Sequence, residues 1–191
     1  TNNGAGGFGF DLEQGFISLN LPGLSSSQII FGKFNSPVGC EPADTPDRTQ
    51  YSYSLVANYS LPGDLTGWMV HSDISSALGL TIFVTNGWDQ NIDLKKGKNI
   101  GGRIEYSREE YLNICLSSIY GSETADSEAK VAVYETDFIY SPFGKLLLGG
   151  NVSYGESRLS NEKLRWIGYY VLANYNLNDW LGLTSRYDYF N

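Results

Sequence analysis

Polar and apolar residues alternate one by one along most of this chain. In residues 145–154 (KLLLGGNVSY), Leu146, Val152 and Tyr154 fall on one face of an extended strand, and Asn151 and Ser153 fall on the other. A period of two predicts β-strands, and helical periodicity is nowhere sustained over three turns. We predict ten strands, at residues 8–21, 28–38, 64–74, 78–88, 99–106, 110–121, 130–140, 145–156, 164–177 and 180–190.

The connections between these strands alternate between short and long. Short ones are expected at 22–27, 75–77, 107–109, 141–144 and 178–179, and long ones at 39–63, 89–98, 122–129 and 157–163. Outer-membrane barrels have short periplasmic turns and longer extracellular loops, and this order matches that rule. The pattern predicts an all-β fold, a transmembrane antiparallel up-and-down β-barrel, of which residues 1–191 form a single segment.

The same rule gives the strands a direction. A strand followed by a short turn descends toward the periplasm, so the first predicted strand descends and the tenth ascends. Because such barrels usually begin and end on the periplasmic side, we expect further strands on both sides and a barrel of about 12–18 strands. Residues 39–63 are expected to be a long loop or a segment folded into the lumen, and residues 51–61 within them an eleventh strand or part of that segment.

Composition and charge narrow the classes of protein that fit. The chain has 14 Tyr, 9 Phe, 4 Trp and 22 Gly, which is typical of β-rich proteins, and no apolar run reaches the roughly 18 residues of a transmembrane helix. A net charge of −8 argues against nucleic acid as a partner. The expected partners are outer-membrane lipid and small hydrophilic solutes, and aromatic girdles at the two interfaces would include Trp68, Trp88, Trp166 and Trp180.

Charged residues of the predicted strands gather on the face that also carries Asn151 and Ser153. Since an unpaired polar group in hydrocarbon costs several kcal/mol, this face should line a water-filled lumen. The predicted pore-lining residues are Asp11, Glu13, Lys33, His71, Asp73, Arg103, Glu105, Glu135, Asp137, Arg186 and Asp188. Their acidic surplus predicts a weak preference for cations. Arg103 with Glu105, and Arg186 with Asp188, are two residues apart on one face, so each pair is alternatively an ion pair that stiffens the wall.

Catalytic and metal sites are not expected. His71 is the single histidine, and there is no nucleophile elbow or pair of metal ligands, so no catalytic residue, metal site or cofactor is predicted. Residues 89–93 (DQNID) begin like a calcium loop, but Leu94 and Ile100 stand where that loop needs Gly and Glu. Cys40 and Cys115 are far apart in sequence, and a disulfide between them is left open.

Several short motifs resemble the OmpL-like β-barrel porin family. They are residues 31–41 (FGKFNSPVGCE), Leu61-Pro62 followed by Thr66-Gly67, residues 84–89 (VTNGWD) and residues 186–190 (RYDYF). The resemblance runs from about Phe10 to the end, and Cys40 departs from it where an apolar residue is expected. It implies a barrel of porin type in the bacterial outer membrane, from a family whose members are longer than this chain.

Two functions follow from these expectations. The first is passive diffusion of small hydrophilic solutes through a porin-like channel, without enzymatic activity. The second is a structural or interaction barrel, which holds a plug or partner, forms a homo-oligomer, or presents its loops in an outer-membrane assembly. The long connection at 39–63, Cys40 and the inward aromatics Phe83 and Tyr111 favour the second function. A soluble carbohydrate-binding β-sandwich would also use many aromatics, but it leaves the alternating connection lengths unexplained.

Overall fold

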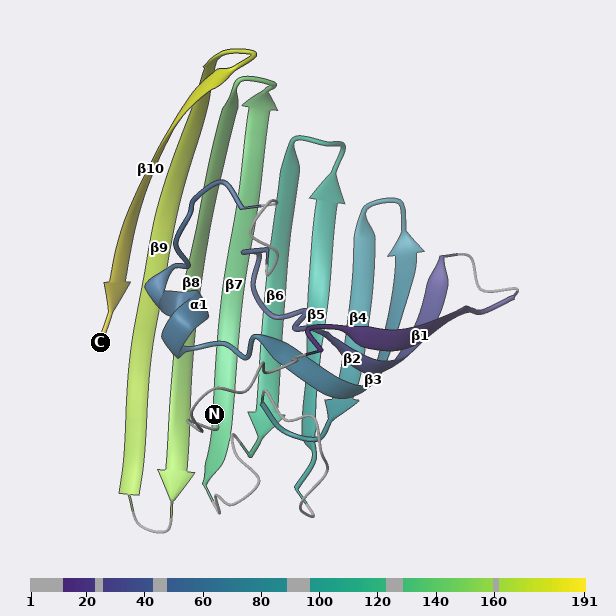
Figure 1. The fold of residues 1–191 in the computed structure, drawn as a ribbon. Coiled ribbons are helices and arrows are strands. Elements are labelled where there is room, and N and C mark those ends of the chain that lie inside the picture. The colour runs from purple at the N-terminus through teal and green to yellow at the C-terminus, as the bar shows by residue number, and fades with distance from the viewer. Residues whose placement is uncertain (1–11, 23–25, 43–47, 89–96, 123–128, 160–161) are drawn as a thin grey trace, which may run out of the picture.

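The computed structural model describes residues 12–22, 26–42, 48–88, 97–122, 129–159 and 162–191. They form one ten-stranded antiparallel sheet in which each strand pairs with its neighbours in chain order (Figure 1). This confirms the predicted all-β, up-and-down arrangement. The strands are β1 (Gly15–Asn20), β2 (Ser27–Asn35), β3 (Asp64–Ser75), β4 (Leu78–Thr85), β5 (Asn99–Arg108), β6 (Leu112–Gly121), β7 (Lys130–Phe143), β8 (Leu146–Leu159), β9 (Glu162–Asn178) and β10 (Leu181–Phe190).

Connection length differs between the two ends of the sheet. At one end, here called the turn end, residues 76–77, 109–111, 144–145 and 179–180 join successive strands. At the other, the loop end, the β2–β3, β4–β5 and β6–β7 connections are longer. The long connection predicted at 157–163 is wrong, because β8 and β9 stay paired as far as Leu159 and Glu162. Ser157, Arg158 and Lys163 therefore belong to an extended hairpin rather than to a loop.

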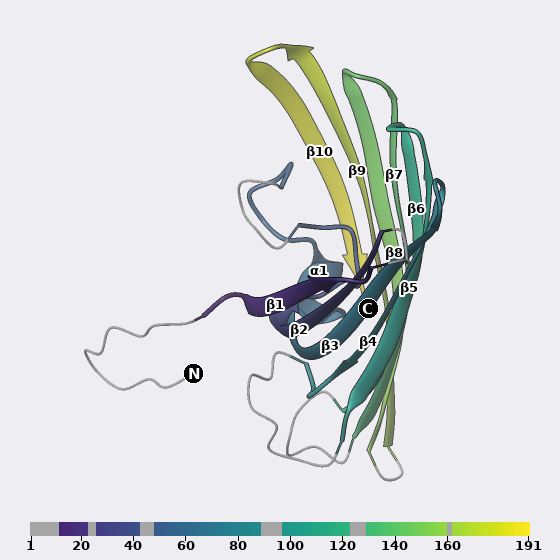
Figure 2. The ribbon, with the colours of Figure 1, turned by 90° about the vertical axis from the view of Figure 1, so that its right-hand side faces the viewer.

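The sheet is open and strongly curved. Within the described part of the chain, β1 and β10 are its two edges, and each pairs with one neighbour only. Figure 2 shows that β1, β2 and a short helix lie on the same side of the wall formed by β4 to β8. We call this hollow side the inner face and the opposite side the outer face. A single sheet of this kind is not a β-sandwich, so the soluble alternative does not fit the described residues.

The two faces differ in chemistry, as the alternation of residues predicts. In β6, Cys115, Ser117 and Ile119 point to the inner face and are buried, whereas Leu116 and Tyr120 on the outer face are more than half exposed. The same alternation holds in β4, β7 and β8. The outer face is thus a broad apolar surface. Its exposure to water would be unfavourable, and contact with hydrocarbon would remove that cost.

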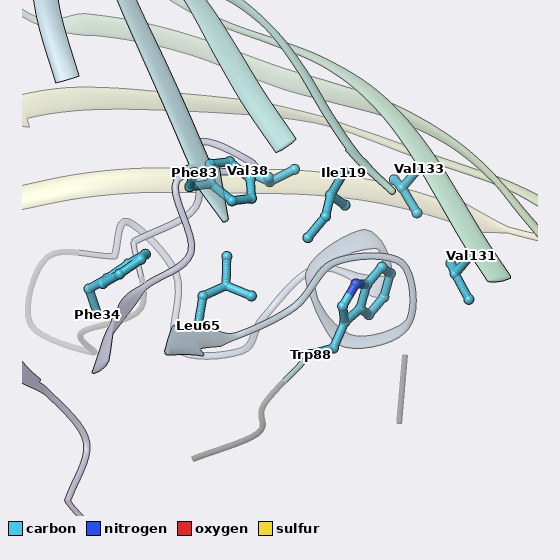
Figure 3. Packing of buried hydrophobic residues seen from close by; sticks show 8 residues of the cluster. All are labelled: Phe34, Val38, Leu65, Phe83, Trp88, Ile119, Val131 and Val133. Carbon is cyan, nitrogen blue, oxygen red and sulfur yellow. The ribbon is translucent and has the colours of Figure 1, made fainter. Parts of the chain in front are cut away.

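A hydrophobic cluster fills part of the inner face near the loop end (Figure 3). It joins Phe34 and Leu65 on β2 and β3 to Phe83, Ile119 and Val133 on β4, β6 and β7. Gly101 on β5 makes room for this contact, since a Cβ atom there would lie 2.2 Å from the Phe83 ring. The cluster holds the β2–β3 end of the sheet against its centre.

Two tryptophans expected in an interfacial girdle belong to this interior instead. Trp88 is 8% exposed within the cluster, and Trp166 packs against it. Trp68 and Trp180 are largely exposed. The girdle assignment is therefore wrong for Trp88 and Trp166, whose positions depend on how the sheet curves rather than on their place in a strand.

The β2–β3 connection lies across the inner face. We call residues 36–63 the crossing segment, of which 36–42 and 48–63 are described. It contains the helix α1 (Leu55–Tyr59), whose first turn is capped by the Ser54 side chain accepting from the Ala57 N–H at 3.1 Å. Residues 51–61 are thus not an eleventh strand. Among the described residues, no helix is long and apolar enough to cross a membrane.

Candidate functional site: the inner face and the crossing segment

A buried ion pair lies at the centre of the inner face. The Arg103 guanidinium on β5 donates to both carboxylate oxygens of Asp137 on β7, at 2.7 and 3.0 Å, and to the Ser117 hydroxyl at 3.0 Å. Glu135 lies 3.9 Å from the same guanidinium and accepts a hydrogen bond from Asn151. The carboxylates of Glu135 and Asp137 are fully buried. One arginine thus balances two buried acids across three strands.

Arg103 does not pair with Glu105, the partner considered from the sequence. Glu105 lies two residues away on the same face, but its carboxylate accepts from Asn113 at 2.8 Å and Ser107 at 3.2 Å. The register places Ser117 opposite Arg103 and Glu135 opposite Ser117. Small serine side chains on β6 therefore let the arginine reach across to β7.

The crossing segment is held to β10 by Arg186. Its guanidinium donates to the Ser52 carbonyl at 2.7 Å, the Ser52 hydroxyl at 3.1 Å and the Tyr53 carbonyl at 2.9 Å. It also pairs with Asp188 at 2.8 Å and with Glu41 at 3.4 Å. The ion pair between Arg186 and Asp188 considered from the sequence is thus present, as part of a larger network. Arginine suits this position because its planar fork offers several donors at once.

The two acids of that network bind the backbone of the crossing segment. Both oxygens of Glu41 accept from the Ser54 N–H, at 3.1 and 3.0 Å. Asp188 accepts from the Leu55 N–H at 3.1 Å. The start of α1 is therefore fixed by acids from two distant parts of the chain, and a helix N-terminus favours such negative groups.

The end of α1 is fixed against β8 and β9. The Ser60 hydroxyl lies 2.6 Å from the Ser153 hydroxyl and accepts from the Trp166 ring N–H at 2.8 Å. Val56 is 1% exposed and packs over Gly168, where a Cβ atom would lie 3.0 Å from it. These contacts are specific and buried, so the crossing segment has a defined position on the inner face.

Two of the larger cavities among the described residues lie on the inner face. One encloses about 590 Å³ between the crossing segment and the sheet, lined by Asn35, Cys40, Asn58, Asn151 and Tyr170 among others. The other, of about 660 Å³ at the turn end, is lined by His71, Asp73 and Glu105. There His71 Nδ1 lies 3.0 Å from the Thr81 hydroxyl and Nε2 lies 3.2 Å from Asp73. Both cavities offer polar groups suited to water and hydrophilic solutes.

Cys40 is half-buried where the crossing segment meets β9. Its Sγ lies 3.0 Å from the Tyr170 hydroxyl, and both Cys40 and Cys115 are free thiols, so they do not form the disulfide that the sequence left open. Burial raises the pKa of the Cys40 thiol from 9.0 to about 12, with a further rise from Asp137. At neutral pH the thiol is protonated, and the thiolate is the reactive form.

We therefore expect Cys40 to resist alkylation. In a Cys115→Ser background, iodoacetamide at pH 8 should label folded Cys40 at least about a hundred-fold more slowly than the urea-unfolded chain. Because the folded pKa lies near 12, the rate should still rise about ten-fold per pH unit between pH 8 and 10. Mass spectrometry measures both rates. A rate that levels off near pH 9 would contradict the burial of the Cys40 thiol.

The predicted pore-lining residues do not all lie on the same face of the sheet. His71, Asp73, Arg103, Glu105, Glu135, Asp137, Arg186 and Asp188 all lie on the inner face, as strand alternation and their contacts require. Lys33 does not: it points away from Phe34, toward the outer face, where it pairs with Asp64 at 3.2 Å and donates to the Leu12 carbonyl. Its side chain is buried beside Asp64 and Leu12, and its assignment to a lumen stays a prediction.

Three further expectations concern the N-terminal region and one loop. Glu13 is exposed and precedes β1, which begins at Gly15 rather than near residue 8. Asp11 and the calcium-like residues 89–93 lie outside the described residues. Among the described residues, no three His, Cys, Asp or Glu side chains are grouped so that they could hold a metal ion.

Several residues of the site were missed from the sequence. Glu41, Ser60, Asn151 and Tyr170 bind or enclose the crossing segment. The alternation had placed Asn151 on the inner face, but nothing local indicated that a segment about a hundred residues away would cover it.

Comparison with known proteins gives one match. A sequence model of the family described as "Putative beta-barrel porin-2, OmpL-like" matches residues 1–191, the whole of this chain. No curated protein and no solved structure matches.

Proposed function

We propose that this chain, which belongs to the OmpL-like family of β-barrel porins, forms part of the wall of a channel for passive diffusion of small hydrophilic solutes. Membership implies a location in the bacterial outer membrane and a role other than catalysis. In more detail, the crossing segment narrows the lumen of this channel, and the channel weakly prefers cations.

The observation that carries this proposal is the difference between the two faces of a single sheet. The outer face presents side chains such as Ile82, Leu116 and Val152, each at least half exposed, whereas the inner face holds the ion pairs, amides and hydroxyls. In a membrane, polar groups must be satisfied internally or face water. A lipid-facing outer side and a hydrated inner side satisfy both conditions.

Cation preference is supported by the charges that remain after pairing. Arg103 is matched by Asp137, and Arg186 by Asp188 and Glu41. Asp73 and Glu105 then remain beside the turn-end cavity, with His71 as a neighbour of Asp73. Acidic side chains at a wide mouth raise the local concentration of cations.

A plugged scaffold is the second candidate. The inner hydrophobic cluster and the anchored crossing segment fill much of the inner face with packed side chains, which favours a barrel that holds its own plug. The two functions differ in whether ions pass.

Conductance of the complete protein in a planar bilayer tests the proposal. With a tenfold KCl gradient, we expect steady channels whose reversal potential has the sign of cation preference. Asp73→Asn with Glu105→Gln should move that potential toward zero, because two acids without a Lys or Arg partner among the described residues are lost, while conductance persists. Glu156→Gln on the outer face is the control and should leave selectivity unchanged. Barrels that insert but stay silent would overturn diffusion in favour of the scaffold.

A further inference from the structure

Cationic side chains form a row on the outer face at the loop end. The register pairs Lys130 on β7 with Arg158 on β8, and Arg158 with Lys163 on β9. Residues opposite each other in adjacent strands share a face, and here it is the face of Tyr134 and Tyr154 rather than that of Glu135 and Ser153. Three cations thus stand side by side over a width of roughly 10 Å.

The next row contains one more cation and one acid. It runs from Ala132 to Glu156 to Arg165. Glu156 lies 2.7 Å from Arg158, 2.5 Å from Lys163 and 4.0 Å from Arg165. Lys130 donates to the Ser122 hydroxyl at 3.0 Å. Four cations against one carboxylate leave the group with an excess of three positive charges.

The arginine heads are open to a ligand despite these contacts. The side chains of Arg158 and Arg165 are 63% and 61% exposed, whereas that of Glu156 is 18% exposed. Glu156 therefore holds the cations together, and both arginine side chains stay more than half exposed, although Nε and one Nη of Arg158 face Glu156. A planar guanidinium binds a phosphate group with two parallel hydrogen bonds.

The apolar surface begins directly beside the cations. The third row is Tyr134, Tyr154 and Ile167, which are 58%, 38% and 44% exposed, and the fourth is Thr136, Val152 and Tyr169. Cations followed by rows of tyrosines mixed with aliphatic side chains is the order found from the headgroup region toward the hydrocarbon of a membrane. The cationic group therefore lies at the depth of lipid headgroups.

We propose that Lys130, Arg158, Lys163 and Arg165 form a docking surface for the phosphate-bearing headgroup of a lipid in the leaflet at the loop end. The proposal rests on the proposed function only in taking the outer face as lipid-facing. Position supports a lipid over a free anion, because the acyl chains of a bound lipid would lie on the adjoining apolar rows. Such a lipid would neutralise cations that otherwise repel one another across three strands.

Lipid binding by the complete protein in detergent micelles tests this surface, with native mass spectrometry as the readout. The probes are a bisphosphorylated, multiply acylated glucosamine disaccharide and the same lipid without phosphates. We expect the phosphorylated lipid to bind more tightly. Arg158→Gln with Arg165→Gln should weaken its binding by about ten-fold or more, at roughly five-fold per cation. Retained heat-modifiable migration on gels shows that the variant is folded.

The matched control removes two cations from the opposite end. Arg108→Gln with Lys145→Gln should leave binding of the phosphorylated lipid unchanged, since Arg108 lies at the turn end. Equal weakening by both double variants, or equal binding of the dephosphorylated lipid, would overturn the proposal. Displacement of the lipid by millimolar inorganic phosphate would also overturn it in favour of a free-anion site. Conductance is measured separately. A barrel that binds the lipid but conducts no ions would therefore refute the proposed channel and leave the lipid-binding proposal standing.

Discussion

Replacing Arg103 with methionine is expected to lower the free energy of unfolding by about 3–5 kcal/mol. The guanidinium balances the fully buried carboxylates of Asp137 and Glu135, and its removal leaves them without a cation in a site that water does not reach. Methionine keeps the volume of the side chain, so the loss measures charge and hydrogen bonding rather than a cavity. Urea titration of the complete protein in micelles gives the free energy.

A second ion pair provides the matched control. Arg158 lies 2.7 Å from Glu156, the same distance as Arg103 from Asp137, but the Arg158 side chain is 63% exposed and that of Arg103 is 12% exposed. Arg158→Gln should therefore cost no more than about 1 kcal/mol. Adding Asp137→Asn to the Arg103 variant should recover part of the loss, because one buried charge is removed with its partner. Equal small effects of Arg103→Met and Arg158→Gln would show that the inner site is hydrated.

The strands and their faces were predictable because the signals for them are local. The alternation in β8 assigns Asn151 and Ser153 to one face and Val152 and Tyr154 to the other, whatever the rest of the chain does. Turn residues likewise mark the ends of strands at residues 76–77 and 144–145. The alternation of polar and apolar residues is lost where a strand extends beyond the membrane, because neither face there contacts hydrocarbon. Residues 157–163 are polar except for Leu159 and favour a loop by sequence, although residues 157–159 and 162–163 belong to the paired hairpin.

The partners within the site were not predictable, because they depend on register and on long-range folding. Arg103 reaches Asp137 across β6, a choice set by which residues of three strands lie opposite one another. A shift of one residue moves a side chain to the other face, so the pairing of Lys33 with Asp64 also depends on register. The crossing segment was recognised as a long connection, but its contacts with Tyr170 and Arg186 join residues more than a hundred positions apart.

Replacing Arg186 with alanine is expected to raise the single-channel conductance several-fold and to increase current fluctuations in the open channel. Arg186 donates to Ser52 and Tyr53 and pairs with Glu41, so its loss removes most of the hydrogen bonds between the crossing segment and β10 and leaves that of Asp188 with Leu55. The remaining contacts include those of Cys40, Leu55, Val56 and Ser60, so residues 52–53 lose their hydrogen bonds to Arg186 while α1 stays in place. A looser segment obstructs the inner cavity less, and planar-bilayer recordings compare the two proteins under the same salt.

A crosslink separates this explanation from a general loss of structure. Ser60 and Ser153 have hydroxyl oxygens 2.6 Å apart, so Ser60→Cys with Ser153→Cys should form a disulfide that ties α1 to β8. In the Arg186→Ala background, the oxidised crosslink should bring conductance partly back toward the original value, because a covalent tie of α1 to β8 limits how far the preceding residues move, and dithiothreitol should raise it again. Cys40 is replaced by serine throughout to prevent exchange. If Arg186→Ala leaves conductance unchanged and the crosslink has no effect, solutes pass elsewhere and the crossing segment serves only to brace the wall.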